Sequence, residues 1–215
     1  MEILYEDRSL TVAVKPPALL SEQTPDHRGF ADLLAARNPD GYVGVVHRLD
    51  RGVGGVMVYA RTPQAAAELS AAVQARRVKK EYLAVIHGVP DELTGEWRDL
   101  LFHDRLKNKT FVVDRTRRGV KEAILSYEIL RTLDHAEHGS LSLVRVALQT
   151  GRTHQIRVQF ASRGYPLLGD GKYGARDRCS IALFSHKLSF SHPVSGKTMA
   201  FSKTPEGEPW ESFSV

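Results

Sequence analysis

Two short runs of the chain place charged and hydrogen-bonding side chains beside apolar residues, a mixture that a plain core segment lacks. One is His47-Arg48-Leu49-Asp50-Arg51, and the other, about a hundred residues later, is Gly151-Arg152-Thr153-His154-Gln155-Ile156-Arg157. Guanidinium groups beside Asp50 favour its ionised form, and an ionised carboxylate can act as a nucleophile or a base. One acid together with several arginines predicts a site for chemistry on a polyanion.

These runs resemble motifs of the RluA branch of the pseudouridine synthases. The other matching segments follow the family's order and cover most of the chain: Ile3-Leu4-Tyr5-Glu6-Asp7, Val14-Lys15-Pro16, Lys80-Glu81-Tyr82-Leu83-Ala84-Val85, and Leu168-Gly169-Asp170 followed by Tyr173-Gly174. The four residues His47-Arg48-Leu49-Asp50 alone would be weak support, because strings of this length recur by chance. Ordered motifs over nearly the whole chain are specific.

The resemblance implies an isomerase that converts uridine to pseudouridine in structured RNA, either rRNA or tRNA. Asp50 matches the family's essential aspartate. It could attack the anomeric carbon, deprotonate the sugar so that a glycal forms, or add to the uracil ring, and the sequence does not decide among these routes. Isomerisation transfers no group from outside and involves no net redox change, so we expect no cofactor.

The resemblance also implies roles for residues of the later motifs. Tyr82 matches the active-site tyrosine that stacks on the target base, which suits a flat uracil. The basic partner of Asp50 comes from the second run, where Arg157 is the first candidate and Arg152 the rival. A helix capped by Thr153 would place Arg157 and His154 on one face. Arg152, in the turn before that helix, would suit a phosphate.

A uridine inside folded RNA must be flipped out to reach a carboxylate, at a cost of a few kcal/mol. In the family, the arginine that matches Arg48 fills or holds the disturbed RNA stack. Leu167 or Leu168 is a candidate for the apolar wall of the uracil pocket. Lys79 and Lys80, which run directly into Tyr82, are candidates for RNA contacts.

One departure from the family's pattern lies beside Asp50. Relatives usually have Thr-Ser-Gly where this chain has Val53-Gly54-Gly55. Two hydroxyl groups are therefore absent next to the expected nucleophile, which leaves open an RNA-binding or RNA-folding protein that has lost catalysis. A third reading is hydrolysis of a nucleoside bond by Asp50 and water, and the Tyr82 and arginine motifs argue against it.

The composition fits a soluble globular protein with a mild excess of positive charge. The 215 residues are 42% hydrophobic and carry a net charge of +5, with a pI of about 9.4, a balance that favours a polyanionic partner. No apolar run approaches a membrane span, and the first residues do not read as a signal peptide. Cys179 is the only cysteine, which suits a reducing cytoplasm. We expect a cytoplasmic monomer without an obligate protein partner or a membrane contact.

Histidines 135 and 138, with their acidic neighbours, mimic a metal cluster, but no further ligand is spaced to complete one, so we expect no metal site.

The elements that must position these residues read as strands with few helices. Alternating or β-branched patterns predict strands over 2–6, 10–15, 43–47, 55–60, 79–87, 110–114, 123–133, 141–150, 181–191 and 198–202. Helices are predicted over 29–37, from Thr62-Pro63 to about Arg76, and from Thr153 to Ser162. The fold class is therefore α+β, a mixed and mostly antiparallel sheet flanked by short helices around a central active-site cleft. We expect a single catalytic domain over residues 1–215, without a separate N-terminal RNA-binding domain.

Overall fold

The computed structural model describes residues 1–38 and 40–214. Contacts divide the chain into two compact units. The first consists of Met1–Lys80 and Phe184–Thr204, and the second of Glu81–Leu183 and Pro205–Val215. Each unit is therefore built from segments that are distant in the sequence.

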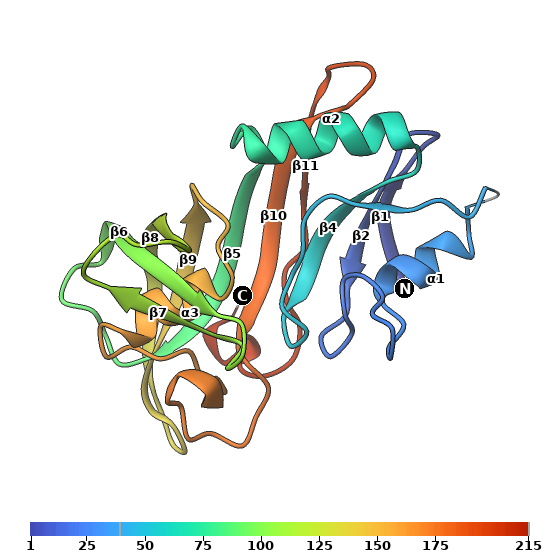
Figure 1. Ribbon diagram of the computed structural model, residues 1–215. Helices are drawn as coiled ribbons and strands as arrows, with labels where there is room; N and C mark the ends of the chain where they lie inside the picture. The colour runs from blue at the N-terminus through green and yellow to red at the C-terminus, as the bar shows by residue number, and fades with distance from the viewer. Residues whose placement is uncertain (39, 215) are drawn as a thin grey trace. The chain divides into compact units, whose positions relative to one another are not determined.

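The first unit holds a mixed sheet (Figure 1). Its strands are β1 (Glu2–Glu6), β2 (Leu10–Lys15), β3 (Gly44–Val45), β4 (Gly54–Ala60), β10 (Leu183–Ser191) and β11 (Thr198–Ser202). The strand order is β1-β2-β4-β10, with β3 on β4 and β11 on β10. The β4–β10 pair is parallel, and the other pairs are antiparallel.

Strand β4 is buried along its whole length because both of its faces are covered. Helix α2 (Pro63–Gln74) begins at Thr62, whose side-chain oxygen accepts a hydrogen bond from the Ala65 amide, with proline at the first helical position. This is a favourable helix start. The apolar side of α2, which includes Leu69, packs against residues of β2, β4 and β10 in one core cluster. Helix α1 (Phe30–Ala35) buries Phe30 and Leu34.

The second unit holds a five-stranded arrangement in the order β5-β9-β8-β6-β7. The strands are β5 (Lys79–His87, whose first two residues belong to the first unit), β6 (Thr94–Asp104), β7 (Lys109–Val113), β8 (Val120–His135) and β9 (Gly139–Leu148). Helix α3 (Gln155–Ala161) and the short 3-10 helices η1 (Gly171–Tyr173) and η2 (Glu211–Phe213) complete the unit.

An aromatic cluster joins α3 to one face of this sheet. The ring centroid of Trp97 on β6 lies 4.4 Å from that of Tyr127 and 4.7 Å from that of Phe160 on α3. Asp99, two residues along β6, accepts hydrogen bonds from the Gln159 side chain at 2.7 Å and from Arg163. Apolar and polar contacts thus hold α3 on the sheet, and with it the sequence run 151–157 that leads into this helix.

The mixed sheet with few helices is confirmed, and most predicted elements are present. The strand predicted over 43–47 is reduced to β3, and β6 was not predicted. The helix predicted over 29–37 is shorter than expected, and Pro39, near its predicted end, lies outside the described residues. Among residues 1–38 and 40–214, no helix is long and apolar enough to cross a bilayer. The single catalytic domain stays a prediction.

The predicted helix start at Thr153 is wrong. Helix α3 begins at Gln155, and its N-cap is His154 in the left-handed region (φ 54°) without a side-chain cap. The turn is closed from inside instead: the Gln155 side-chain oxygen accepts hydrogen bonds from the Arg152 amide and the Thr150 hydroxyl. His154 and Arg157 therefore do not share a helical face, because His154 precedes the helix.

Candidate active site

Asp50 lies in the loop of the first unit between β3 and β4, and both flanks of this loop are held. The Asp50 carbonyl accepts a hydrogen bond from the Val53 amide at 2.9 Å. The amide and carbonyl of the buried Leu49 each bond to the Ser21 hydroxyl at 3.0 Å. The Val58 amide donates to Nε2 of His47 at 3.1 Å. The half-buried Asp50 side chain therefore starts from a fixed backbone.

A buried lysine accompanies Asp50. Lys15 ends β2 and is completely buried, and its Nζ donates to the carbonyls of Pro16 at 2.9 Å and Leu19 at 2.6 Å. Burial lowers the pKa of Lys15 to about 8, while the charge of Asp50 acts in the opposite direction. Lys15 belongs to a segment that resembles a family motif, but its contact with the Asp50 loop was not predicted. A lysine that ends an apolar strand before two prolines was the signal.

Burial also lowers the pKa of two other side chains of the first unit, His47 and Lys80. The pKa of His47 lies well below its usual value, because burial and then the charge of Lys80 disfavour the imidazolium. The neutral ring fits its bond to Val58, because Nε2 must be unprotonated to accept it. Burial also lowers the pKa of Lys80 to about 8, whereas Lys79 is exposed.

The Arg48 side chain is exposed to solvent, whereas the side chain of its neighbour Leu49 is buried. Its side chain is 68% exposed and its Nη1 lies 2.6 Å from a carboxylate oxygen of Glu22. An exposed ion pair of this kind contributes about 0–1 kcal/mol. Arg48 can therefore exchange Glu22 for a phosphate or a base at small cost.

The Val53-Gly54-Gly55 sequence is closely packed. Val53 is buried. A Cβ atom at Gly54 would lie 3.2 Å from the Lys15 carbonyl oxygen. Gly55 has a φ of +125°, and a Cβ there would lie 2.3 Å from the Ser185 carbonyl oxygen of β10. The glycines allow β4 to approach β2 and β10, so this departure from the expected pattern has a packing role.

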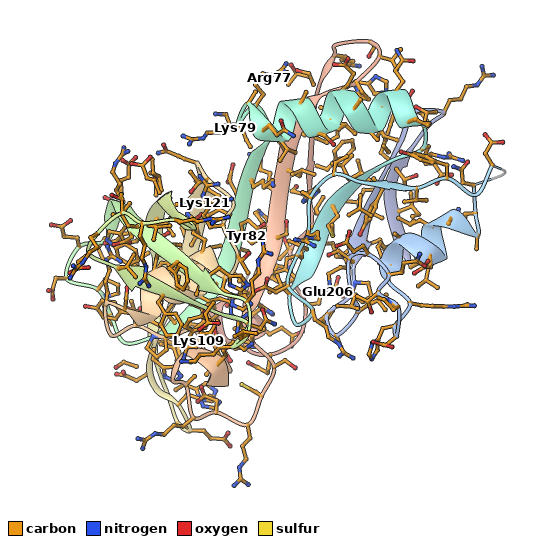
Figure 2. All side chains as sticks on the ribbon, viewed as in Figure 1. Arg77, Lys79, Tyr82, Lys109, Lys121 and Glu206 are labelled. Atoms are coloured by element: carbon orange, nitrogen blue, oxygen red, sulfur yellow. The ribbon has the colours of Figure 1, made fainter. Side chains whose placement is uncertain are left out.

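In the second unit, Tyr82 and Leu168 belong to one hydrogen-bonded layer. Tyr82 is buried on β5 (Figure 2). The Leu168 amide donates to the Val85 carbonyl of β5, and the Leu168 carbonyl accepts from the Ala182 amide, both at 2.9 Å. Leu168 is itself buried, as an apolar wall residue would be.

Arg157 is held by a carboxylate of its own unit. Its Nε and Nη2 each donate to one oxygen of Asp170, both at 2.7 Å. Asp170 is almost completely buried, and the guanidinium carbon lies 5.1 Å from the centroid of the Tyr173 ring. A bidentate pair over an aromatic ring fixes the orientation of an arginine. Asp170 and Tyr173 lie in the last quoted motif, but their support of Arg157 was not predicted.

The other two candidates of the second run also make contacts within the unit. The Arg152 Nε donates to the Glu122 carbonyl at 2.8 Å. His154 is buried, and its Nδ1 lies 3.0 Å from the Tyr173 hydroxyl. The substrate and RNA roles of these residues stay predictions.

Comparison with known proteins identifies the family. The family model of the RNA pseudouridylate synthases matches residues 9–162, a range that contains Asp50, Tyr82 and Arg157. An RNA pseudouridine synthase of Synechocystis sp. is 33% identical over 92% of this chain and 63% of its own length. The ribosomal large subunit pseudouridine synthase D of Pseudomonas aeruginosa is 34% identical over 98% of this chain and 70% of its own length.

Solved structures share the fold. Human RNA pseudouridylate synthase domain containing 1 has a TM-score of 0.78 at 23% identity, covering 95% of this chain and 83% of that chain. Human RNA pseudouridylate synthase domain containing 4 has a TM-score of 0.76, also at 23% identity, covering 94% of this chain and 88% of that chain. This chain spans 63% of the length of the Synechocystis relative. By its family match and by relatives above 30% identity, this protein belongs to the RNA pseudouridylate synthase family.

Proposed function

We propose that this protein converts uridine to pseudouridine in structured RNA, with Asp50 as the nucleophile or base. The observation that carries the proposal is the family match over residues 9–162, which contains the held Asp50 loop. The reaction breaks the bond between N1 of uracil and the anomeric carbon, and forms a bond from C5 to the same carbon. C5 loses a proton and N1 gains one, so no other reactant is needed.

A carboxylate can serve each route that the sequence left open, provided that it is ionised. Lys15 supports this role for Asp50, because its ammonium group is close enough for the Asp50 charge to act on its pKa. The backbone bonds of Leu49 and Val53 reduce the freedom that the loop would lose on binding. Such preorganisation favours reaction because the attacking group is already oriented.

In this proposal Tyr82 stacks on the uracil while it turns, and Arg157 is the cation that pairs with the catalytic carboxylate. The bidentate bond to Asp170 supports the choice of Arg157 over Arg152, because it presents a guanidinium in one orientation. Arg152 instead donates through Nε to a backbone carbonyl. Arg48, exposed and weakly paired, holds the RNA stack from which the uridine has left.

The proposed substrate is rRNA or tRNA. The relative from Pseudomonas aeruginosa is named for the large ribosomal subunit, which supports rRNA as the first RNA to test. The net charge of +5 favours either RNA.

The test is pseudouridine mapping of total RNA from cells with and without this protein, followed by assay of the purified chain on the mapped RNA. Asp50→Asn should reduce pseudouridine formation about 10² to 10⁴-fold, the usual contribution of a catalytic acid–base group, while RNA affinity is retained. Asp26→Asn, at an exposed position of the same unit, should keep full activity. Full activity of Asp50→Asn would overturn the proposal.

Two other outcomes identify the alternatives. RNA binding without pseudouridine in either RNA class, by the unmodified protein, would identify a catalytically impaired RNA-binding protein, as the missing hydroxyls at Val53 and Gly54 suggest. Release of free uracil would identify a hydrolase.

A further inference from the structure

One face of the β6–β7–β8 arrangement presents aromatic and apolar side chains to the outside. Phe102 of β6 and Phe111 of β7 are directly opposite partners, as are Leu100 and Val113, and Val120 of β8 lies opposite Phe102. Directly opposite residues of antiparallel strands share a face. We call these five residues the open face. Helix α3 covers the other face, where it meets Trp97 and Asp99.

The open face is accessible as well as apolar. Phe111 is 37% exposed, and Leu100, Phe102, Val113 and Val120 are half-buried. Leu106, in the turn between β6 and β7, is 100% exposed. Exposed aromatic and apolar groups that cluster on one sheet face indicate a binding surface more than a chance exposure.

A cation lies near each of the two phenylalanine rings. The guanidinium carbon of Arg117 lies 4.6 Å from the Phe102 ring centroid, and Nζ of Lys109 lies 5.9 Å from that of Phe111. Residues 105–121 contain seven basic side chains and one acid, Asp114. The basic residues are Arg105, Lys107, Lys109, Arg115, Arg117, Arg118 and Lys121, of which Lys109 and Lys121 are labelled in Figure 2.

Acidic groups on the same strands are partly compensated, including Glu122, which lies directly opposite Leu100. Glu122 is paired with Arg98 at 2.9 Å, and Glu96 accepts a hydrogen bond from the Gln149 side chain at 2.6 Å. Arg98 also lies 3.7 Å from Glu96, so this one arginine offsets part of the charge of both acids. The occupant that complements the open face carries negative charge and flat apolar groups together.

We propose that the open face binds single-stranded nucleotides of the RNA substrate, with a base stacked on Phe111 and phosphates on the surrounding cations. The inference deepens the proposed function and rests on it for RNA as the partner. Single-stranded nucleotides fit because an unstacked base offers a flat surface to an aromatic ring, whereas bases inside a duplex do not. An acidic protein would satisfy the cations but would gain little from the ring of Phe111.

The experiment measures binding of a fluorescein-labelled, roughly 12-nucleotide oligouridylate, a length within the range that single-strand binding surfaces cover. Phe111→Ala should weaken binding about 5-fold or more, the effect of losing one base stack. Val112→Ala is the matched control: Val112 is the next residue of β7, is also 37% exposed, and points to the opposite face. It should bind within about 2-fold of the unmodified protein. Equal affinity of the two variants would overturn the stacking proposal.

A second measurement separates base stacking from charge. Arg117→Gln should lower the slope of log affinity against log salt by about 0.7, the value for one phosphate contact with a single strand. Poly-glutamate should compete poorly with the oligouridylate. Competition at equal charge concentration would instead identify an acidic protein as the partner and would overturn the assignment to RNA. Thermal unfolding of each variant shows whether the sheet is intact.

The two proposals fail separately. An unmodified protein that forms pseudouridine, with a Phe111→Ala variant that binds normally, would overturn only this inference. If the unmodified protein forms no pseudouridine but Phe111→Ala still weakens oligouridylate binding, only the proposed activity is overturned.

Discussion

At the scale of single residues, Arg157 and Asp170 form a bidentate pair that involves one of the candidate site residues. Both oxygens of Asp170 are used by one guanidinium, and the carboxylate side chain is 1% exposed. Breaking a buried pair is costly because the remaining charge loses its partner and cannot be hydrated. The pair therefore contributes to the stability of the second unit as well as to the orientation of Arg157.

Asp170→Asn should lower the free energy of unfolding by about 2 to 4 kcal/mol, because a neutral amide cannot replace the two charge-assisted hydrogen bonds that Asp170 accepts from Arg157. Urea unfolding followed by tryptophan fluorescence measures the change. Asp114→Asn is the control, because Asp114 pairs with Arg115 at the surface with both side chains more than 80% exposed. It should unfold like the unmodified protein, and the same result for Asp170→Asn would contradict the structural role assigned to Asp170.

Candidate site residues that stand in motifs could be named from the sequence, whereas the residues that contact them in the fold could not. Asp50, Tyr82 and Arg157 stand in quoted motifs whose chemistry is visible in the residue types. Lys15 was unremarked because its burial depends on contacts with carbonyls of residues 16 and 19. The predicted helix start at Thr153 was wrong for a similar reason. The side chain of Gln155 accepts the hydrogen bonds of that turn, which the sequence does not reveal.

At the scale of elements, the placement of Asp50 depends on how closely β4 packs on its neighbours. The parallel pairing of β4 with β10 joins Gly54 to Phe184 and Gly55 to Ser185. Gly55 combines a φ of +125° with a backbone contact that leaves no room for a Cβ. Strain and overlap thus act at the same position, Gly55, five residues after the predicted nucleophile.

Gly55→Ala should destabilise the first unit by about 3 to 5 kcal/mol. This figure adds the cost of a strained backbone conformation to the cost of overpacking against β10. The measurement is the urea midpoint together with the soluble yield. Gly171→Ala is the matched control, since a Cβ there meets no atom within 4 Å. A Gly55→Ala variant with an unchanged midpoint would show that β4 and β10 do not approach as described.

Strand β6 shows why element prediction fell short. Its inward side carries Trp97, Asp99, Leu101 and His103, so a charged residue interrupts the apolar alternation that predicts strands. Asp99 is tolerated there because Gln159 and Arg163 of a later segment donate to it. Strands β5 and β11 match their predicted ranges, because β5 contains an unbroken apolar run over 82–86 and the larger apolar residues alternate in β11.

At the scale of the whole molecule, the division into two units was not predicted, because it does not follow the order of the chain. Residues 184–204 complete the sheet begun by residues 2–60, and 205–215 return to the second unit. No composition shift or linker marks these crossings, since each segment is an ordinary amphipathic strand or turn. Pairings between distant segments are decided by side-chain packing, which one sequence does not reveal.

Buried titratable groups give the molecule a distinctive dependence of stability on pH. The pKa of His47 lies below its usual value of 6.5, so the unfolded chain binds more protons below that pH and stability falls there. The pKa values of Lys15 and Lys80 are lowered from 10.5 to about 8, so the unfolded chain again binds more protons between these limits. Stability should therefore rise from pH 8 towards pH 10. Above pH 10 the raised pKa of the buried Tyr59 reverses the trend.

Lys80→Met tests the alkaline part of this curve, because it removes a half-buried ammonium group whose pKa is lowered by burial and keeps a long apolar side chain. In the unmodified protein, Lys15 and Lys80 should each add about 1 to 2 kcal/mol to the free energy of unfolding between pH 8 and pH 10. Lys80→Met should be more stable at pH 7 and should show about half of the rise, since Lys15 titrates with a similar pKa.

Lys79→Met is the comparison for this test, because Lys79 is the exposed neighbour on the same strand and its substitution should leave the rise unchanged. Urea unfolding at intervals from pH 7 to pH 10 measures both variants. Equal slopes in Lys80→Met and Lys79→Met would show that the Lys80 ammonium group is solvated in the folded protein. The rise would then have to come from Lys15 alone, and Lys80 would be available for the RNA contact predicted from its place before Tyr82.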